Sequence, residues 1–109
     1  MVVEFLYWEG CPSHPQALSD LREAMGELGL DPTAVAVREI DTEDAADAER
    51  FTGSPTIRID GRDIQDPGDE AAGLTCRVYH LRDGRVSPAP DPEDLRDALH
   101  RARTEQEPA

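Results

Sequence analysis

Lysine is absent from this 109-residue chain, and its eleven basic residues are all arginine. Set against 24 acidic residues, they leave a formal net charge of −13. A surface with this excess of negative charge repels nucleic-acid phosphates and anionic lipid headgroups. We therefore expect neither a nucleic-acid partner nor a membrane partner, and nothing in the sequence specifies an oligomeric state.

Long apolar runs are also missing, and cysteine is scarce. No run of 18 apolar residues is present, and the first residues lack the basic start and the small-residue cleavage site of a signal peptide. The two cysteines, Cys11 and Cys76, are too few for a disulfide scaffold or a structural zinc site. We expect a cytoplasmic protein with two thiols, no metal and no cofactor.

The hydrophobic pattern predicts alternating strands and helices. It places strands at 2–8, 34–40, 56–60 and 75–81, helices at 14–28, 43–50 and 92–103, and a loop at 62–74. Ser13, Thr42 and Asp91 precede the helices as N-caps, Gly53 follows the second helix, and Asp60-Gly61 forms a tight turn. The order βαβ-α-ββα predicts one α/β domain over 1–104, followed by a frayed tail at 105–109.

The stretch at residues 5–15 (FLYWEGCPSHP) carries the chemistry that the sequence predicts. An apolar strand stops at Gly10, and Cys11 follows at once, just before a helix start. The unpaired N–H groups and positive dipole end of a helix stabilise a thiolate and lower the pKa of its thiol. Cys11 is therefore a candidate reactive thiol, and the alternative is a small buried hydrophobic residue.

Two neighbours of Cys11 have alternative interpretations. His14 follows it by one helical turn, where an imidazole can pair with a thiolate or act as a base. Alternatively, His14 is an exposed first-turn residue in water. Trp8 is expected to line the groove beside the site, with Tyr7 turned into the core.

Gly10-Cys11-Pro12 at the first strand-to-helix junction, together with Gly-Ser-Pro-Thr at 53–56, resembles the thioredoxin fold at its glutaredoxin end. The Asp-Gly-Arg-Asp turn at 60–63 and the Cys-Arg-Val-Tyr stretch at 76–79 are similar to small bacterial thioredoxin-family proteins, some labelled alkylmercury-lyase-like. This resemblance implies a central four-stranded mixed sheet with helices on both faces. It also implies a cis bond between Ser54 and Pro55, with Pro12, Ser54 and Pro55 beside Cys11 as the site for an extended thiol ligand.

The chain departs from that family in its cysteines. His14 occupies the place of the second cysteine of a CxxC pair. In the resembled topology the strand at 75–81 starts at the far end of the sheet, about 20 Å away, whereas bridged Cα atoms lie within about 7 Å. We therefore expect Cys76 to pack in the interior, and the alternative is a bridge to Cys11 in which the loop at 62–74 repositions Cys76. Arg58, Arg62 and Arg77 are expected to keep sheet edges soluble.

Three functions are compatible with these residues. In the first, Cys11 is the nucleophile of a monothiol (CxxH) thiol-disulfide oxidoreductase whose partner is a low-molecular-weight thiol or a protein cysteine. In the second, the same thiol binds a soft ion such as mercury or arsenite, or a protein cysteine, without redox turnover. In the third, the protein is an interaction subunit without chemistry.

Overall fold

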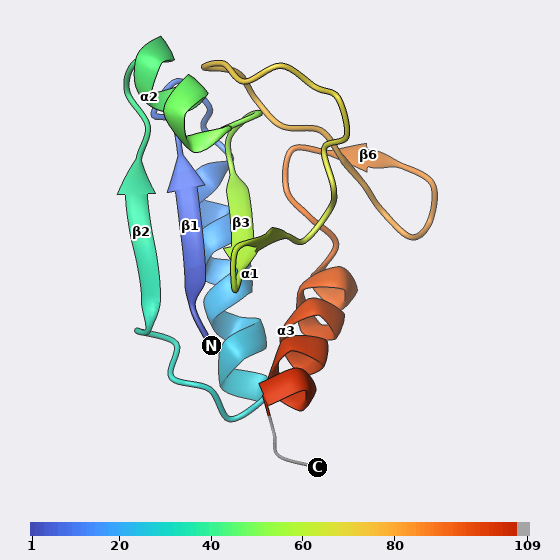
Figure 1. Ribbon diagram of the computed structural model, residues 1–109. Helices are drawn as coiled ribbons and strands as arrows, with labels where there is room; N and C mark the ends of the chain where they lie inside the picture. Colours follow the sequence, from blue (N-terminus) through green and yellow to red (C-terminus); the bar gives the residue numbers. More distant parts are fainter. Residues whose placement is uncertain (107–109) are drawn as a thin grey trace.

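The computed structural model describes residues 1–106 and contains three helices and six strands within them (Figure 1). The elements are β1 (Val3–Tyr7), α1 (His14–Glu27), β2 (Val35–Glu39), α2 (Glu43–Glu49), β3 (Thr56–Ile59), β4 (Arg62–Asp63), β5 (Tyr79–His80), β6 (Val86–Ser87) and α3 (Pro92–Gln106). The last helix continues beyond its expected end near residue 103. Of the expected tail, residues 107–109 lie outside the described residues. No helix in the described part is long and apolar enough to cross a bilayer.

Four strands form a mixed sheet in the order β2-β1-β3-β4. β1 and β2 are parallel, whereas β3 is antiparallel to both β1 and β4. This confirms a mixed α/β architecture with four strands, and the β3–β4 turn lies at Asp60-Gly61 as expected. Both turn residues have positive φ values, 52° and 81°, which suits a tight two-residue hairpin.

The fourth strand differs from the expected one. It is the two-residue strand β4, which lies inside the expected loop at 62–74. Of the stretch expected as a strand at 75–81, only Tyr79–His80 is assigned, as β5, and it pairs with β6 in a separate two-stranded sheet. Within this stretch, Cys76 forms a β-bridge with Ser54, and Tyr79 and His80 pair with β6. The stretch therefore does not form an edge strand of the four-stranded sheet.

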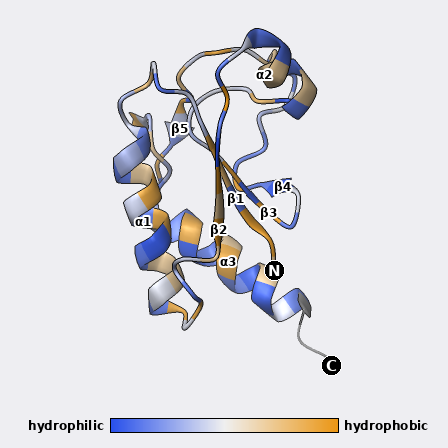
Figure 2. Ribbon diagram, turned by 90° about the vertical axis from the view of Figure 1, so that its left-hand side faces the viewer, coloured by the Kyte–Doolittle hydropathy of each residue, from blue (hydrophilic) through white to orange (hydrophobic). Residues whose placement is uncertain are grey.

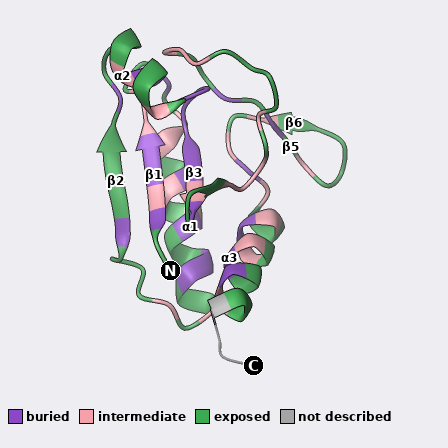
Figure 3. Cartoon of the chain, viewed as in Figure 1, coloured by how far each residue is buried: buried purple, intermediate pink, exposed green. Residues whose placement is uncertain are grey.

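Alternating side chains of β1 pack into two apolar clusters on opposite faces of the sheet. Phe5 belongs to the cluster shared with α1 and α3, and Leu6 belongs to the cluster shared with α2. Figure 2 shows α1 and α2 on opposite sides of the strands, and Figure 3 shows that the buried residues lie where the helices meet the sheet. α2 is short, so it covers only the end of its face near the β1–α1 loop.

The helix ends follow local sequence signals. Thr42 caps α2 by accepting a hydrogen bond from the Ala45 N–H at 3.0 Å, as expected. α2 then stops at Arg50, which is left-handed with a φ of 53°, before the glycine expected to end it. The guanidinium of Arg58 donates to the carbonyls of Glu49 and Arg50, and thereby satisfies acceptors that the helix leaves free.

Candidate functional site

Cys11 lies in the short loop between β1 and α1 and is 1 % exposed. The loop is closed by a hydrogen bond of 3.1 Å from the Cys11 N–H to the Trp8 carbonyl. The Trp8 ring lies across Gly10, and a β-carbon at Gly10 would collide with that ring. The glycine is therefore needed for the chain to turn under the indole and deliver Cys11 to the start of α1.

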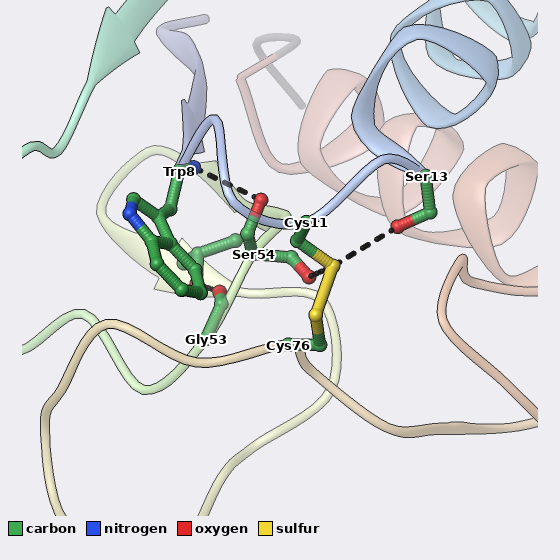
Figure 4. The surroundings of a disulfide bond; sticks show 7 residues. Trp8, Cys11, Ser13, Gly53, Ser54 and Cys76 are labelled. Carbon is green, nitrogen blue, oxygen red and sulfur yellow. Dashed lines mark hydrogen bonds between the residues drawn. A yellow bond between two sulfur atoms is a disulfide. The ribbon is translucent and has the colours of Figure 1, made fainter.

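Cys11 is joined to Cys76 by a disulfide, with the two Cα atoms 5.6 Å apart (Figure 4). This corrects the expectation that Cys76 packs in the interior at the far end of the sheet. The expectation was wrong because it placed Cys76 in a strand of the main sheet. The residues around Cys76 instead cross the end of the sheet at which β1 gives way to α1. Cys76 is exposed, so the two halves of the disulfide differ sharply in their access to solvent.

Backbone hydrogen bonds hold the Cys76 segment against Ser54. The Ser54 N–H donates to the Thr75 carbonyl at 2.8 Å, and the Arg77 N–H donates to the Ser54 carbonyl at 2.9 Å. These two bonds form a parallel bridge between Ser54 and Cys76. At the neighbouring Gly53, a β-carbon would lie only 2.9 Å from the Arg77 nitrogen. The missing side chain of Gly53 thus allows the two backbones to approach.

The buried side chain of Arg77 binds the Cys76 segment to residues 63–65. Arg77 is 4 % exposed, and its guanidinium binds both carboxylate oxygens of Asp63, at 2.7 and 3.0 Å, and the carbonyl of Gln65. It also lies over the Tyr79 ring, 4.8 Å from the centroid. Burial disfavours the charged form, but the hydrogen bond and charge of Asp63 outweigh it, so the pKa of Arg77 is raised. The expectation that Arg77 solubilises a sheet edge was therefore wrong.

Tyr79 connects this anchor to the proline segment. Burial raises the pKa of Tyr79, which remains a neutral phenol and donates a hydrogen bond of 2.6 Å to the Pro55 carbonyl. The bond between Ser54 and Pro55 is cis, as the resemblance implied. Polar and cation–ring contacts thus connect the half-buried Asp63 through the buried Arg77 and Tyr79 to the carbonyl of Pro55.

Ser54 lies at the Cys11 sulfur, as expected, and Trp8 binds Ser54 through its backbone. The Ser54 carbonyl oxygen is 3.6 Å from Cys11 Sγ, and its hydroxyl accepts a hydrogen bond of 3.0 Å from the Trp8 backbone N–H. Trp8 packs against the apolar cluster near α2, and Pro12 is exposed beside the site. The structure therefore brings Ser54 to the Cys11 sulfur and joins the Trp8 backbone to both residues, while Pro55 follows Ser54 in the chain. The expected role of these residues in binding a ligand stays a prediction.

The start of α1 contributes a hydroxyl to the site. Ser13 occupies the N-cap position, but its side chain makes no capping hydrogen bond. Its Oγ instead lies 3.5 Å from Cys11 Sγ (Figure 4). A serine hydroxyl at this distance is placed to donate to a thiolate once the disulfide is reduced.

His14 turns toward different partners. Its Nε2 lies 3.7 Å from Glu9 Oε1, and its ring stacks on Tyr7 with 4.4 Å between the ring centroids. Among the described residues, no contact joins His14 to Cys11, so its predicted role as base stays a prediction. The described part also contains no group of three residues able to hold a metal ion.

Sequence reasoning named Cys76 but placed it away from Cys11, and it missed the buried Arg77 as a member of the site. One signal was present in the order Cys-Arg-Val-Tyr, because alternation in an extended chain puts Arg77 and Tyr79 on one side and Cys76 on the other. Comparison with protein-family models, curated proteins and solved structures finds no match to this chain. Its function must therefore be inferred from the geometry of the site.

Proposed function

We propose that this protein is a thiol-disulfide oxidoreductase of thioredoxin-like fold in which Cys11 and Cys76 form the redox pair. The observation that carries the proposal is a disulfide between a buried cysteine just before a helix and a cysteine that is exposed at the surface. The thioredoxin-like assignment is supported by the Gly-Cys-Pro junction between β1 and α1 and by the Gly-Ser-Pro-Thr segment that leads into β3.

The proposed reaction moves two electrons in two exchange steps. In the reduced protein, one thiolate attacks a low-molecular-weight disulfide, so that a mixed disulfide forms and the first small thiolate leaves. The other protein thiolate then attacks the protein sulfur of the mixed disulfide, and the second small thiolate leaves. The protein dithiol is thereby oxidised, and the two small thiolates take up the two protons it releases. The reverse sequence reduces the protein.

This scheme changes the predicted monothiol cycle in one respect. That cycle needed an external thiol to resolve the mixed disulfide, because His14 stands where a CxxC protein has its second cysteine. Cys76 now supplies the second sulfur from a distant part of the chain. The hydroxyl of Ser13 serves to stabilise the Cys11 thiolate, and His14 keeps its proposed role as a nearby base in the reduced protein.

The test is a comparison of three proteins in exchange with bis(2-hydroxyethyl) disulfide. We expect the reduced wild type to release two small thiols and to form its own disulfide. Cys11→Ser and Cys76→Ser should each release one small thiol and stop as a mixed disulfide, which mass spectrometry detects. A wild type that stops at the mixed disulfide would support the monothiol cycle. A wild type that does not react would rule out the redox function.

A second candidate is the sequestration of a soft ion by the reduced pair. The observation that favours it is that the disulfide brings the Cα atoms of the two cysteines to 5.6 Å, and the pair of neighbouring thiolates that reduction would release suits a soft metal or arsenite. Stoichiometric arsenite binding that requires both cysteines, in a protein without disulfide turnover, would select this function over the first.

A further inference from the structure

We propose that Cys76, rather than Cys11, is the sulfur that exchanges with the external partner, and that Arg77 is the positioning residue that holds Cys76 over Cys11. The proposal rests on the redox function proposed above, but it concerns the order of events within the pair. It replaces the expectation that Cys11 is the nucleophile that meets the substrate.

The first support is the unequal access to the two cysteines. Cys11 is 1 % exposed and is enclosed by Ser13, Ser54 and the disulfide itself, whereas Cys76 lies at the surface. Exchange requires the attacking sulfur to approach in line with the bond that breaks. A small thiolate arriving from solvent therefore meets Cys76 before Cys11, and its attack on Cys76 Sγ expels the Cys11 thiolate beside the Ser13 hydroxyl.

The second support is that the Cys76 segment is held by contacts that do not depend on the disulfide. Ser54 uses both its N–H and its carbonyl in hydrogen bonds to Thr75 and Arg77. The Gly73 N–H also donates to the Phe51 carbonyl, at 2.9 Å, and so binds the approach to the segment. These bonds remain available after reduction, so the segment continues to cover Cys11.

The third support is the anchoring of Arg77, the residue next to Cys76. Its guanidinium is paired with Asp63, capped by the Gln65 carbonyl and stacked on Tyr79. Removing one partner of a buried ion pair leaves the other charge unpaired, so the arrangement resists opening. Arg77 touches neither sulfur among its described contacts, and it acts by fixing the backbone from which Cys76 projects.

The proposed sequence of exchange steps accounts for every bond and proton. In reduction, a small thiolate forms a bond to Cys76 Sγ, and the bond between the two protein sulfurs breaks to release the Cys11 thiolate. A second small thiolate then attacks the external sulfur of the mixed disulfide. This step yields the small disulfide and the Cys76 thiolate, and the two protein thiolates take up the two protons that the small thiols gave up. Oxidation follows the same steps in reverse.

The test compares the two single-cysteine proteins in their reaction with 2,2′-dithiodipyridine, a neutral aromatic disulfide. We expect Cys76 in the Cys11→Ser protein to react at least about tenfold faster than Cys11 in the Cys76→Ser protein, because the buried thiol must wait for a local opening. In urea the two rates should become similar, which controls for intrinsic thiol reactivity. Equal rates in the folded proteins, or a faster Cys11, would overturn the proposal.

A second set of variants tests Arg77 in the Cys76→Ser background. Arg77→Met should release the segment and raise the Cys11 reaction rate severalfold, and Arg77→Lys should restore part of the protection. Arg58→Met is the matched control, because Arg58 is a partly buried and paired arginine of β3 whose guanidinium binds the end of α2 instead of the Cys76 segment. An increase of equal size in the Arg58 variant would assign Arg77 to general stability alone and overturn its positioning role.

These outcomes are separable from the failure of the redox function. Suppose that the wild type does not exchange with bis(2-hydroxyethyl) disulfide, while Cys76 still reacts faster than Cys11 with 2,2′-dithiodipyridine. This result would overturn the oxidoreductase function, but Cys76 would remain the sulfur that an external reagent meets first. If Arg77→Met does not fold, its Cys11 rate will equal the rate in urea. The two single-cysteine proteins then decide which sulfur meets the partner, and Arg77→Lys decides the positioning role: a faster Cys11 reaction than in the Arg77 protein supports it, and an unchanged rate overturns it.

Discussion

At the scale of single residues, the site depends on a glycine as much as on its cysteines. Gly53 has a φ of 146°, and it is the position at which the backbone of the Cys76 segment approaches most closely. A side chain here would press on backbone atoms, which cannot rotate away as a flexible side chain would. Gly53 therefore permits the bridge between Ser54 and Cys76.

We predict that Gly53→Ala destabilises the oxidised protein by about 2 kcal/mol or more, because it adds a backbone collision to an unfavourable φ. The measurement is the free energy of unfolding in urea. The matched control is Gly61→Ala, since Gly61 also has a positive φ but open space around its Cα. That variant should lose only about 1 kcal/mol. If both variants lose the same free energy of unfolding, the close approach of the two backbones at Gly53 does not add to the cost of the substitution.

At the scale of elements, the start of α3 joins that helix to the loop of the β5–β6 hairpin. One carboxylate oxygen of Asp91 accepts a hydrogen bond of 2.9 Å from the Glu93 N–H, and the other accepts one of 3.1 Å from the Arg82 N–H. The Arg82 side chain adds ion pairs to Asp94 and Asp97 on the same helix. Because the hairpin follows directly after Arg77, this junction also limits how far the Cys76 segment can move.

We predict that Asp91→Ala lowers the free energy of unfolding by about 1 kcal/mol at neutral pH, the usual value of an N-cap. Backbone hydrogen bonds from Arg82 and Glu93 lower the pKa of Asp91 in the folded protein. Its stabilisation is therefore present above the unfolded-state pKa, about 3.9, and is lost as the pH falls through the lower folded value. The difference between wild type and variant should shrink in acid.

Urea unfolding at several pH values measures this difference. Asp69→Ala, in the exposed loop before the Cys76 segment, is the control and should change stability little at any pH. A difference for Asp91→Ala that stays constant down to pH 2 would show that the carboxylate does not cap the helix in its charged form.

At the scale of the whole molecule, the dominant feature is the net charge of −13. Most of the acidic side chains are exposed, and the arginines that pair with them leave a large excess of negative charge. A charged reagent that approaches Cys76 therefore feels the field of the whole surface as well as its nearest neighbours.

We predict that small disulfides react with the protein in order of charge. Cystamine, a dication, should react about tenfold faster at low salt than the dianion of 3,3′-dithiodipropionate, with bis(2-hydroxyethyl) disulfide between them. The contrast should fall at high salt, because the Debye length shortens from about 10 Å at 0.1 M to about 3 Å at 1 M. The rates of the same reagents with a neutral model thiol correct for intrinsic reactivity. A rate order that ignores charge would show that local contacts govern access.

The sequence by itself determined the features that depend on a few neighbouring residues. Thr42 and Asp91 begin helices, Asp60-Gly61 turns a hairpin, and β1 ends at Tyr7, shortly before Gly10 and Cys11. Each of these outcomes follows from local dihedral preferences and from backbone groups that need partners within one turn. The sequence could therefore indicate where one half of the site lies.

Only the tertiary structure decided which residues complete the site. The alternation around Cys76 predicted an extended segment, but periodicity states neither the partner of such a segment nor the end of the sheet at which it lies. The partner depends on contacts between residues far apart in the chain, namely the close approach at Gly53 and the pairing of Arg77 with Asp63. Those contacts bring Cys76 to Cys11 across 65 residues of sequence. They are favoured because buried polar groups need hydrogen-bond partners, and this arrangement supplies partners to the Ser54 backbone and the Arg77 side chain.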